Sequence, residues 1–88
     1  MGFELVIKTF QGETFNIKDL EATSTFGNLI DKVFSLLPKA PSKESIQLVH
    51  NGQPINKDNN SALSGKTLQS LNIGNKQHLF VVFRVIGG

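Results

Sequence analysis

The chain has 88 residues, of which 39% are hydrophobic and 18% are charged, and its formal net charge is +2. This length supports a single domain with one modest core, and it leaves no room for a deep active-site cavity. The absence of Cys excludes a disulfide framework and a thiolate zinc site, and the scattered Lys and Arg residues predict no nucleic-acid interface.

The first elements form a β-hairpin. Residues 3–10 alternate between apolar and polar side chains, which predicts a strand with one buried face. Residues 14–18 resume the alternation after a short loop that contains Gly12. The polar residues 19–24 are expected to turn the chain. The side chains expected to point inward are Phe3, Leu5, Ile7, Phe15 and Ile17.

The apolar period then changes from two to 3.6, which predicts an amphipathic helix. Thr25 or a neighbouring Ser or Thr caps its start, because a side-chain oxygen there accepts a bond from an otherwise unpaired N–H. Pro38 and Pro41 are expected to end it. Its apolar stripe consists of Phe26, Leu29, Ile30, Val33, Phe34 and Leu37.

Residues 46–49 predict a short strand, followed by a turn at Asn51 and Gly52 and a brief return around residues 54–55. Residues 56–64 are rich in Asn, Ser, Lys and Asp, so we expect a mobile loop there.

Residues 67–73 then predict a helical turn that returns to the core, and Gly74 and Asn75 form the last turn.

The final strand is the most apolar segment. If Leu79, Val81 and Phe83 face the helix, Phe80 and Val82 must point away from it, since side chains alternate along a strand. One helix against one mixed sheet makes a two-layer α+β domain.

Six segments in order resemble the ubiquitin family of β-grasp modifiers. The matching residues are 7–12, Thr25-Phe26 with Asn28-Leu29, 48–52, 65–68, 71–73 and 83–88. The resemblance implies a mixed sheet of four to five strands packed on one helix, in the order ββαββ. It also implies that residues 1–88 form one domain whose residues 85–88 are a flexible C-terminal tail.

The family's chemistry implies a protein modifier. Gly88 would be activated by an ATP-dependent enzyme, passed as a thioester to a carrier cysteine, and joined by a ligating enzyme to a target lysine. Gly87 and Gly88 suit this role because glycine permits close backbone approach. Arg84 matches a family arginine just before the tail, which implies contact with a carboxylate of the activating enzyme. The alternative is a solvated arginine that closes the strand.

The resemblance also implies a partner-binding patch. Phe10, Val49 and Val82 correspond to the apolar residues by which the family's partners grip the modifier, and Phe80 replaces a family histidine beside them. Such a patch would bind domains of the ubiquitin-binding type, since contiguous exposed apolar surface marks partner sites. The alternative is that these side chains are scattered surface hydrophobics, or that the loop 56–64 covers them.

Some positions depart from the family. Extra residues occur around 37–43 and 56–64, and Ile86 replaces a second arginine, which restricts the enzymes that would accept the tail. Two family lysines used for chains correspond to Gln53 and Asn75, so single attachment is favoured.

Two other lysines, Lys8 and Lys32, do align with family lysines, but single attachment is still favoured over chain formation.

Two other functions stay open: a docking domain cut from a larger protein, and a sulfur carrier of the same fold. No catalytic constellation is found: residues 64–67 lack the first glycine of a phosphate-binding loop, and His50 and His78 have no partners at metal or triad spacing. We therefore expect a monomeric protein without enzyme activity, cofactor, metal or membrane segment. Without a leader or a long apolar stretch, it is expected in the cytoplasm or nucleus.

Overall fold

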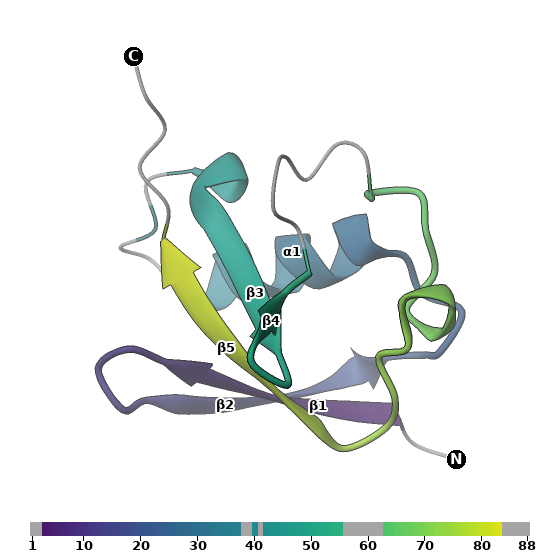
Figure 1. Cartoon of the computed structure of the whole chain (residues 1–88), viewed down its shortest axis with the longest axis horizontal. Coiled ribbons are helices and arrows are strands. Elements are labelled where there is room, and N and C mark those ends of the chain that lie inside the picture. Colours follow the sequence, from purple (N-terminus) through teal and green to yellow (C-terminus); the bar gives the residue numbers. More distant parts are fainter. Residues whose placement is uncertain (1–2, 38–39, 41, 56–62, 84–88) are drawn as a thin grey trace.

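A computed structural model describes residues 3–37, 40, 42–55 and 63–83. Its strands form one sheet in the order β2-β1-β5-β3-β4, and α1 lies across one face of it (Figure 1). β1 and β5 are parallel, whereas the other neighbouring strands are antiparallel. This confirms the predicted two-layer α+β domain with a mixed sheet. The elements are β1 (Phe3–Thr9), β2 (Thr14–Leu20), α1 (Phe26–Leu36), the 3-10 helix η1 (Lys43–Ser45), β3 (Ile46–His50), β4 (Gln53–Pro54), the 3-10 helix η2 (Gln69–Leu71) and β5 (Gln77–Phe83).

The first hairpin forms as predicted, but β2 is longer than expected. Its pairing with β1 is regular from Leu5 opposite Ile17 onward, and it becomes irregular where Phe3 faces both Asp19 and Leu20. This irregularity shifts the alternation, so that Ile17 and Leu20 both reach the core although they are three residues apart. The prediction that the chain turns from residue 19 was therefore wrong.

The helix begins where its capping residue predicted. The Thr25 side chain accepts a hydrogen bond from the Asn28 N–H at 3.2 Å, and Leu37 follows the last helical residue. Of the predicted apolar stripe, Phe34 is half-buried and the other five side chains are buried. Pro38 and Pro41 lie outside the described residues, so their expected role in ending the helix is not tested.

The segment after the long loop is joined to the start of the helix. Lys66 O accepts from Phe26 N at 2.8 Å, and Ser64 O accepts from Gly27 N at 3.1 Å. These bonds satisfy N–H groups that a helix start leaves without intrahelical partners. The predicted helical turn is confirmed as η2, with Leu68 and Ile73 buried beside it. Of the expected mobile loop, residues 56–62 lie outside the described residues.

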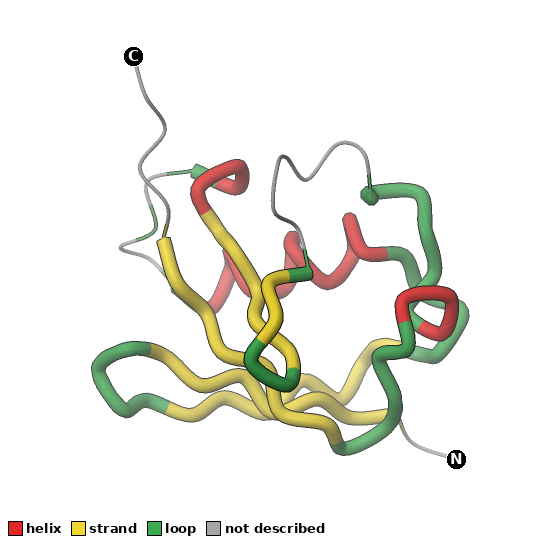
Figure 2. Tube along the Cα trace, viewed as in Figure 1, coloured by secondary structure: helices red, strands yellow, loops and turns green. Residues whose placement is uncertain are grey.

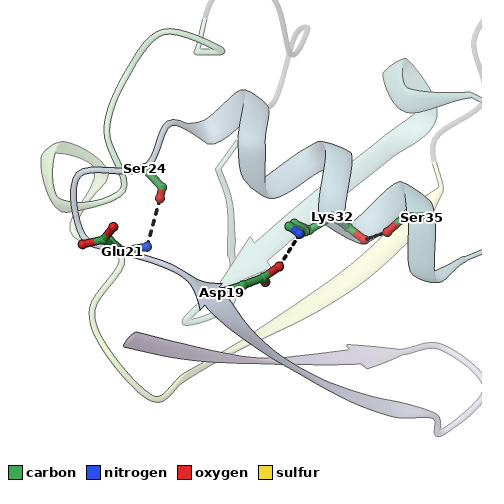
Figure 3. Close-up of polar contacts among 5 residues, drawn as sticks. All are labelled: Asp19, Glu21, Ser24, Lys32 and Ser35. Atoms are coloured by element: carbon green, nitrogen blue, oxygen red, sulfur yellow. Dashed lines mark hydrogen bonds and ion pairs between the residues drawn. The ribbon is translucent and has the colours of Figure 1, made fainter. Parts of the chain in front are cut away.

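A polar contact joins the middle of α1 to the end of β2. Lys32 donates a hydrogen bond to the Asp19 carboxylate (Figure 3). The Asp19 side chain is largely exposed, and that of Lys32 is partly exposed. The hydrogen bond from Lys32 lowers the pKa of Asp19. Nearby, the Ser24 hydroxyl accepts from Glu21 N at 2.9 Å and shapes the turn between β2 and α1.

β5 is the central strand of the sheet, and its inner face is only partly covered. Leu79 and Val81 are buried as predicted, but 46% of Phe83 is exposed. The helix ends at Leu36 and so does not extend over the last inward residue of β5. The prediction of Phe83 as a core residue was therefore wrong. Within the described residues, no helix is long and apolar enough to span a membrane.

Candidate functional site

The sheet face opposite α1 brings together three of the four predicted patch residues. Val49 of β3 stands directly opposite Phe80 of β5, and Val82 follows on the same face. Their neighbours Leu48, Leu79 and Val81 are buried, so alternation turns these three side chains outward. Phe80 is 51% exposed, whereas Val49 and Val82 are half-buried. We call Val49, Phe80 and Val82 the outer patch.

Two further residues border the outer patch. Lys8 of β1 is the partner of Phe80 on the side away from Val49, so the ring lies between an aliphatic and a cationic side chain. Val6, two residues before Lys8 and on the same face, is half-buried. Val6 was not among the predicted site residues, although its place in the β1 alternation put its side chain on the outward face.

Phe10 lies apart from the strands that carry the outer patch. It follows the last residue of β1 in the β1–β2 loop, and 91% of it is exposed. It borders a groove that Val82 also lines. Phe10 is thus an exposed aromatic residue that is not part of the outer patch but lines a groove next to it.

The groove beside Phe10 has a volume of about 830 Å³. It lies between the β1–β2 loop, the end of α1 and the end of β5, and it explains the exposure of Phe83. Leu36 and Leu37 form its helix side. The apolar surface therefore continues from the outer patch around the end of β5.

The residues predicted for conjugation, namely Arg84, Gly87 and Gly88, lie outside the described residues. The structure does show where the chain leaves the sheet toward them. Phe83, directly before Arg84, pairs with Ile46 of β3, and β5 is held between β1 and β3. Because the pairing of β5 with β1 ends at Val81, the departure point of this segment is held by β3 alone among the described strands.

The described residues contain no cluster of three or more His, Cys, Asp or Glu side chains that could hold a metal ion. His50 is half-buried at the end of β3, and His78 is exposed on β5. In the described residues, the candidate site is therefore an apolar surface, the outer patch, bordered by the cationic side chain of Lys8.

Comparison with known proteins supports the fold. No protein-family model matches the chain, and no curated protein matches it in sequence. Among solved structures it is similar to a ubiquitin of Caldiarchaeum subterraneum, with a TM-score of 0.71 over 100% of both chains and 19% sequence identity. The chain has the ubiquitin-like β-grasp fold.

Proposed function

We propose that this protein is a ubiquitin-like modifier that is joined to target lysines through the carboxylate of Gly88. The observation that carries the proposal is a ubiquitin-like fold whose strand β5 is followed in the sequence by Arg84-Val85-Ile86 and the Gly87-Gly88 pair. In this role its partners are activating, carrier and ligating enzymes in the cytoplasm or nucleus. The protein is their substrate and the resulting signal.

The proposed chemistry needs ATP and a thiol from the partner enzymes. The Gly88 carboxylate attacks the α-phosphate of ATP and displaces pyrophosphate, which gives an acyl adenylate. A thiolate then displaces AMP to form a thioester. A lysine amine displaces the thiol, loses a proton to solvent and forms the amide bond.

The structure supports this role by holding the base of the tail. Two glycines without side chains can enter a narrow enzyme channel. The glycines are presented best when the segment before them starts from a fixed point, and Phe83, the last residue of β5, is paired with Ile46 of β3. A paired strand therefore fixes the point from which the segment that carries the reacting carboxylate begins.

Conjugation is tested with the chain expressed to end at Gly88 and tagged at its N-terminus. Incubation with ATP and an extract of the source organism should give adducts of higher mass. Those cleaved by added thiol are thioesters, and those that resist it are amides. Deleting Gly87 and Gly88 should abolish both kinds, whereas deleting Met1 and Gly2, a matched loss of two residues, should leave them. Adducts that persist without the two glycines would refute the proposal.

A second candidate function is a docking domain that is never conjugated. It is favoured by the outer patch itself, which depends only on the pairing of β3 with β5. An apolar surface of this kind fits the apolar side of an amphipathic helix. Binding of a ubiquitin-interacting helical peptide by a protein that forms no adducts would select this function.

A further inference from the structure

The turn between β3 and β4 places two successive residues in the left-handed backbone region. His50 pairs with Gln53, so Asn51 and Gly52 alone form the loop (Figure 2). Both have positive φ angles, 55° at Asn51 and 78° at Gly52. Such turns favour the Asn-Gly sequence because its residues tolerate the left-handed region. Both residues are exposed to solvent.

Two groups of this turn could react with each other, namely the side-chain amide of Asn51 and the backbone nitrogen of Gly52, and both residues are exposed. A Cβ placed on Gly52 would meet no atom within 4 Å, so the turn is open on the side to which that atom would point. Within the described part of the chain, the Gly52 N–H donates to no acceptor. Asn51 is also the only asparagine in the whole sequence that glycine follows.

We propose that Asn51 is a site of spontaneous deamidation. The Gly52 backbone nitrogen loses its proton to hydroxide and attacks Cγ of Asn51. The bond from Cγ to the side-chain nitrogen breaks, and ammonia leaves after taking a proton from water. Water then opens the resulting five-membered imide at either carbonyl. The product is aspartate, or isoaspartate with the chain running through the side chain.

Ring closure requires the turn to leave its hairpin geometry, and the structure makes that opening local. β4 has two residues at the edge of the sheet and is held to β3 by two residue pairs. One further bond, from Ile55 N to Leu48 O at 2.8 Å, fastens the strand that follows. Edge segments with so few bonds open at far lower free energy than the whole fold.

The modification would act on the outer patch, and this consequence rests on the proposed function. Either product adds a negative charge two residues from Val49. Isoaspartate also lengthens the two-residue loop, which disturbs the pairing of Val49 with Pro54. A partner that recognises Val49 and Phe80 would therefore bind the aged protein less tightly than the fresh protein.

The site is tested by mass spectrometry on the full chain, incubated in its native state in mildly alkaline buffer. Peptide mapping should show conversion of Asn51 at least about tenfold faster than that of any other asparagine, a barrier difference of about 1.4 kcal/mol. Isoaspartate should exceed aspartate. Asn51→Gly, which keeps the positive φ but lacks the amide, should show no change at this position.

A second arm measures binding of a ubiquitin-interacting helical peptide before and after incubation. Affinity should fall for the wild type and stay constant for Asn51→Gly. If native protein keeps its Asn51 amide while protein in denaturant loses it, the folded turn is protective and the modification site is refuted. Because the mass measurement involves no partner, it stands or falls separately from the proposed modifier function.

Discussion

Leu48 and Val49 are neighbours on β3 that point to opposite faces of the sheet. Leu48 is fully buried, whereas Val49 is half-buried in the outer patch. Truncating each residue to Ala therefore separates the contribution of the core from that of the outer patch. Leu48→Ala should damage the core, and Val49→Ala should damage partner binding.

The expected magnitudes follow from burial. Leu48→Ala leaves a cavity in a closed core and should cost about 3 kcal/mol, which lowers the melting temperature by roughly 12–24 °C in a domain of this size. Val49→Ala removes two carbons that are half-buried, at about 0.8 kcal/mol for each fully buried carbon. It should cost about 0.8 kcal/mol, or roughly 3–6 °C.

Thermal unfolding followed by circular dichroism measures the stability of both variants. Titration of a ubiquitin-interacting helical peptide then measures binding by folded Val49→Ala. If Val49 is central to the interface, its truncation should cost about 1–2 kcal/mol, which weakens binding roughly 5–30-fold. A loss of stability for Val49→Ala equal to that for Leu48→Ala would show that Val49 is a core residue. Unchanged binding by folded Val49→Ala would remove it from the partner site.

Two further predictions concern the helix. Thr25→Ala should lose the hydrogen bond from Asn28 N and about 1 kcal/mol of stability, measured by chemical denaturation, while Thr25→Ser should retain most of it; equal losses would contradict a capping role. For Asp19, NMR titration should find a pKa below its ordinary value, and Lys32→Met should raise it. Because the folded-state pKa is the lower one, the contribution of the pair to stability is present above the unfolded-state pKa and is lost as pH falls through the folded-state pKa. The stability difference between wild type and Lys32→Met should therefore vanish in acid, and a difference that persists there would contradict this linkage.

The sequence predicted most of the fold because its signals were local. Alternation in residues 3–10 and the helical stripe from Phe26 each report which face of an element is apolar, and that face is the one buried. The capping residue Thr25 fixed the start of α1 because a helix start needs an acceptor for its free N–H groups. Alternation along the last strand also placed Phe80 and Val82 on its outward face, whereas Val49 was assigned to the patch through the resemblance to the ubiquitin family.

Two errors arose where alternation was not enough. Leu20 reaches the core through a register shift opposite Phe3, and such shifts depend on how two strands pair. Phe83 points to the helix side, but the helix ends short of it. A strand pattern states which way a side chain points, and it does not state whether another element covers it.

The sequence by itself therefore determined the elements, their faces and the Gly87-Gly88 pair on which the proposed chemistry depends. Tertiary structure alone decided which outward residues meet. The register of β3 against β5 placed Val49 opposite Phe80, whereas Phe10 lies in the β1–β2 loop. It also showed that the Asn51-Gly52 turn is exposed and held by few bonds. The physical reason is that side-chain direction is a property of the local backbone, whereas proximity and cover depend on pairing between segments far apart in the chain.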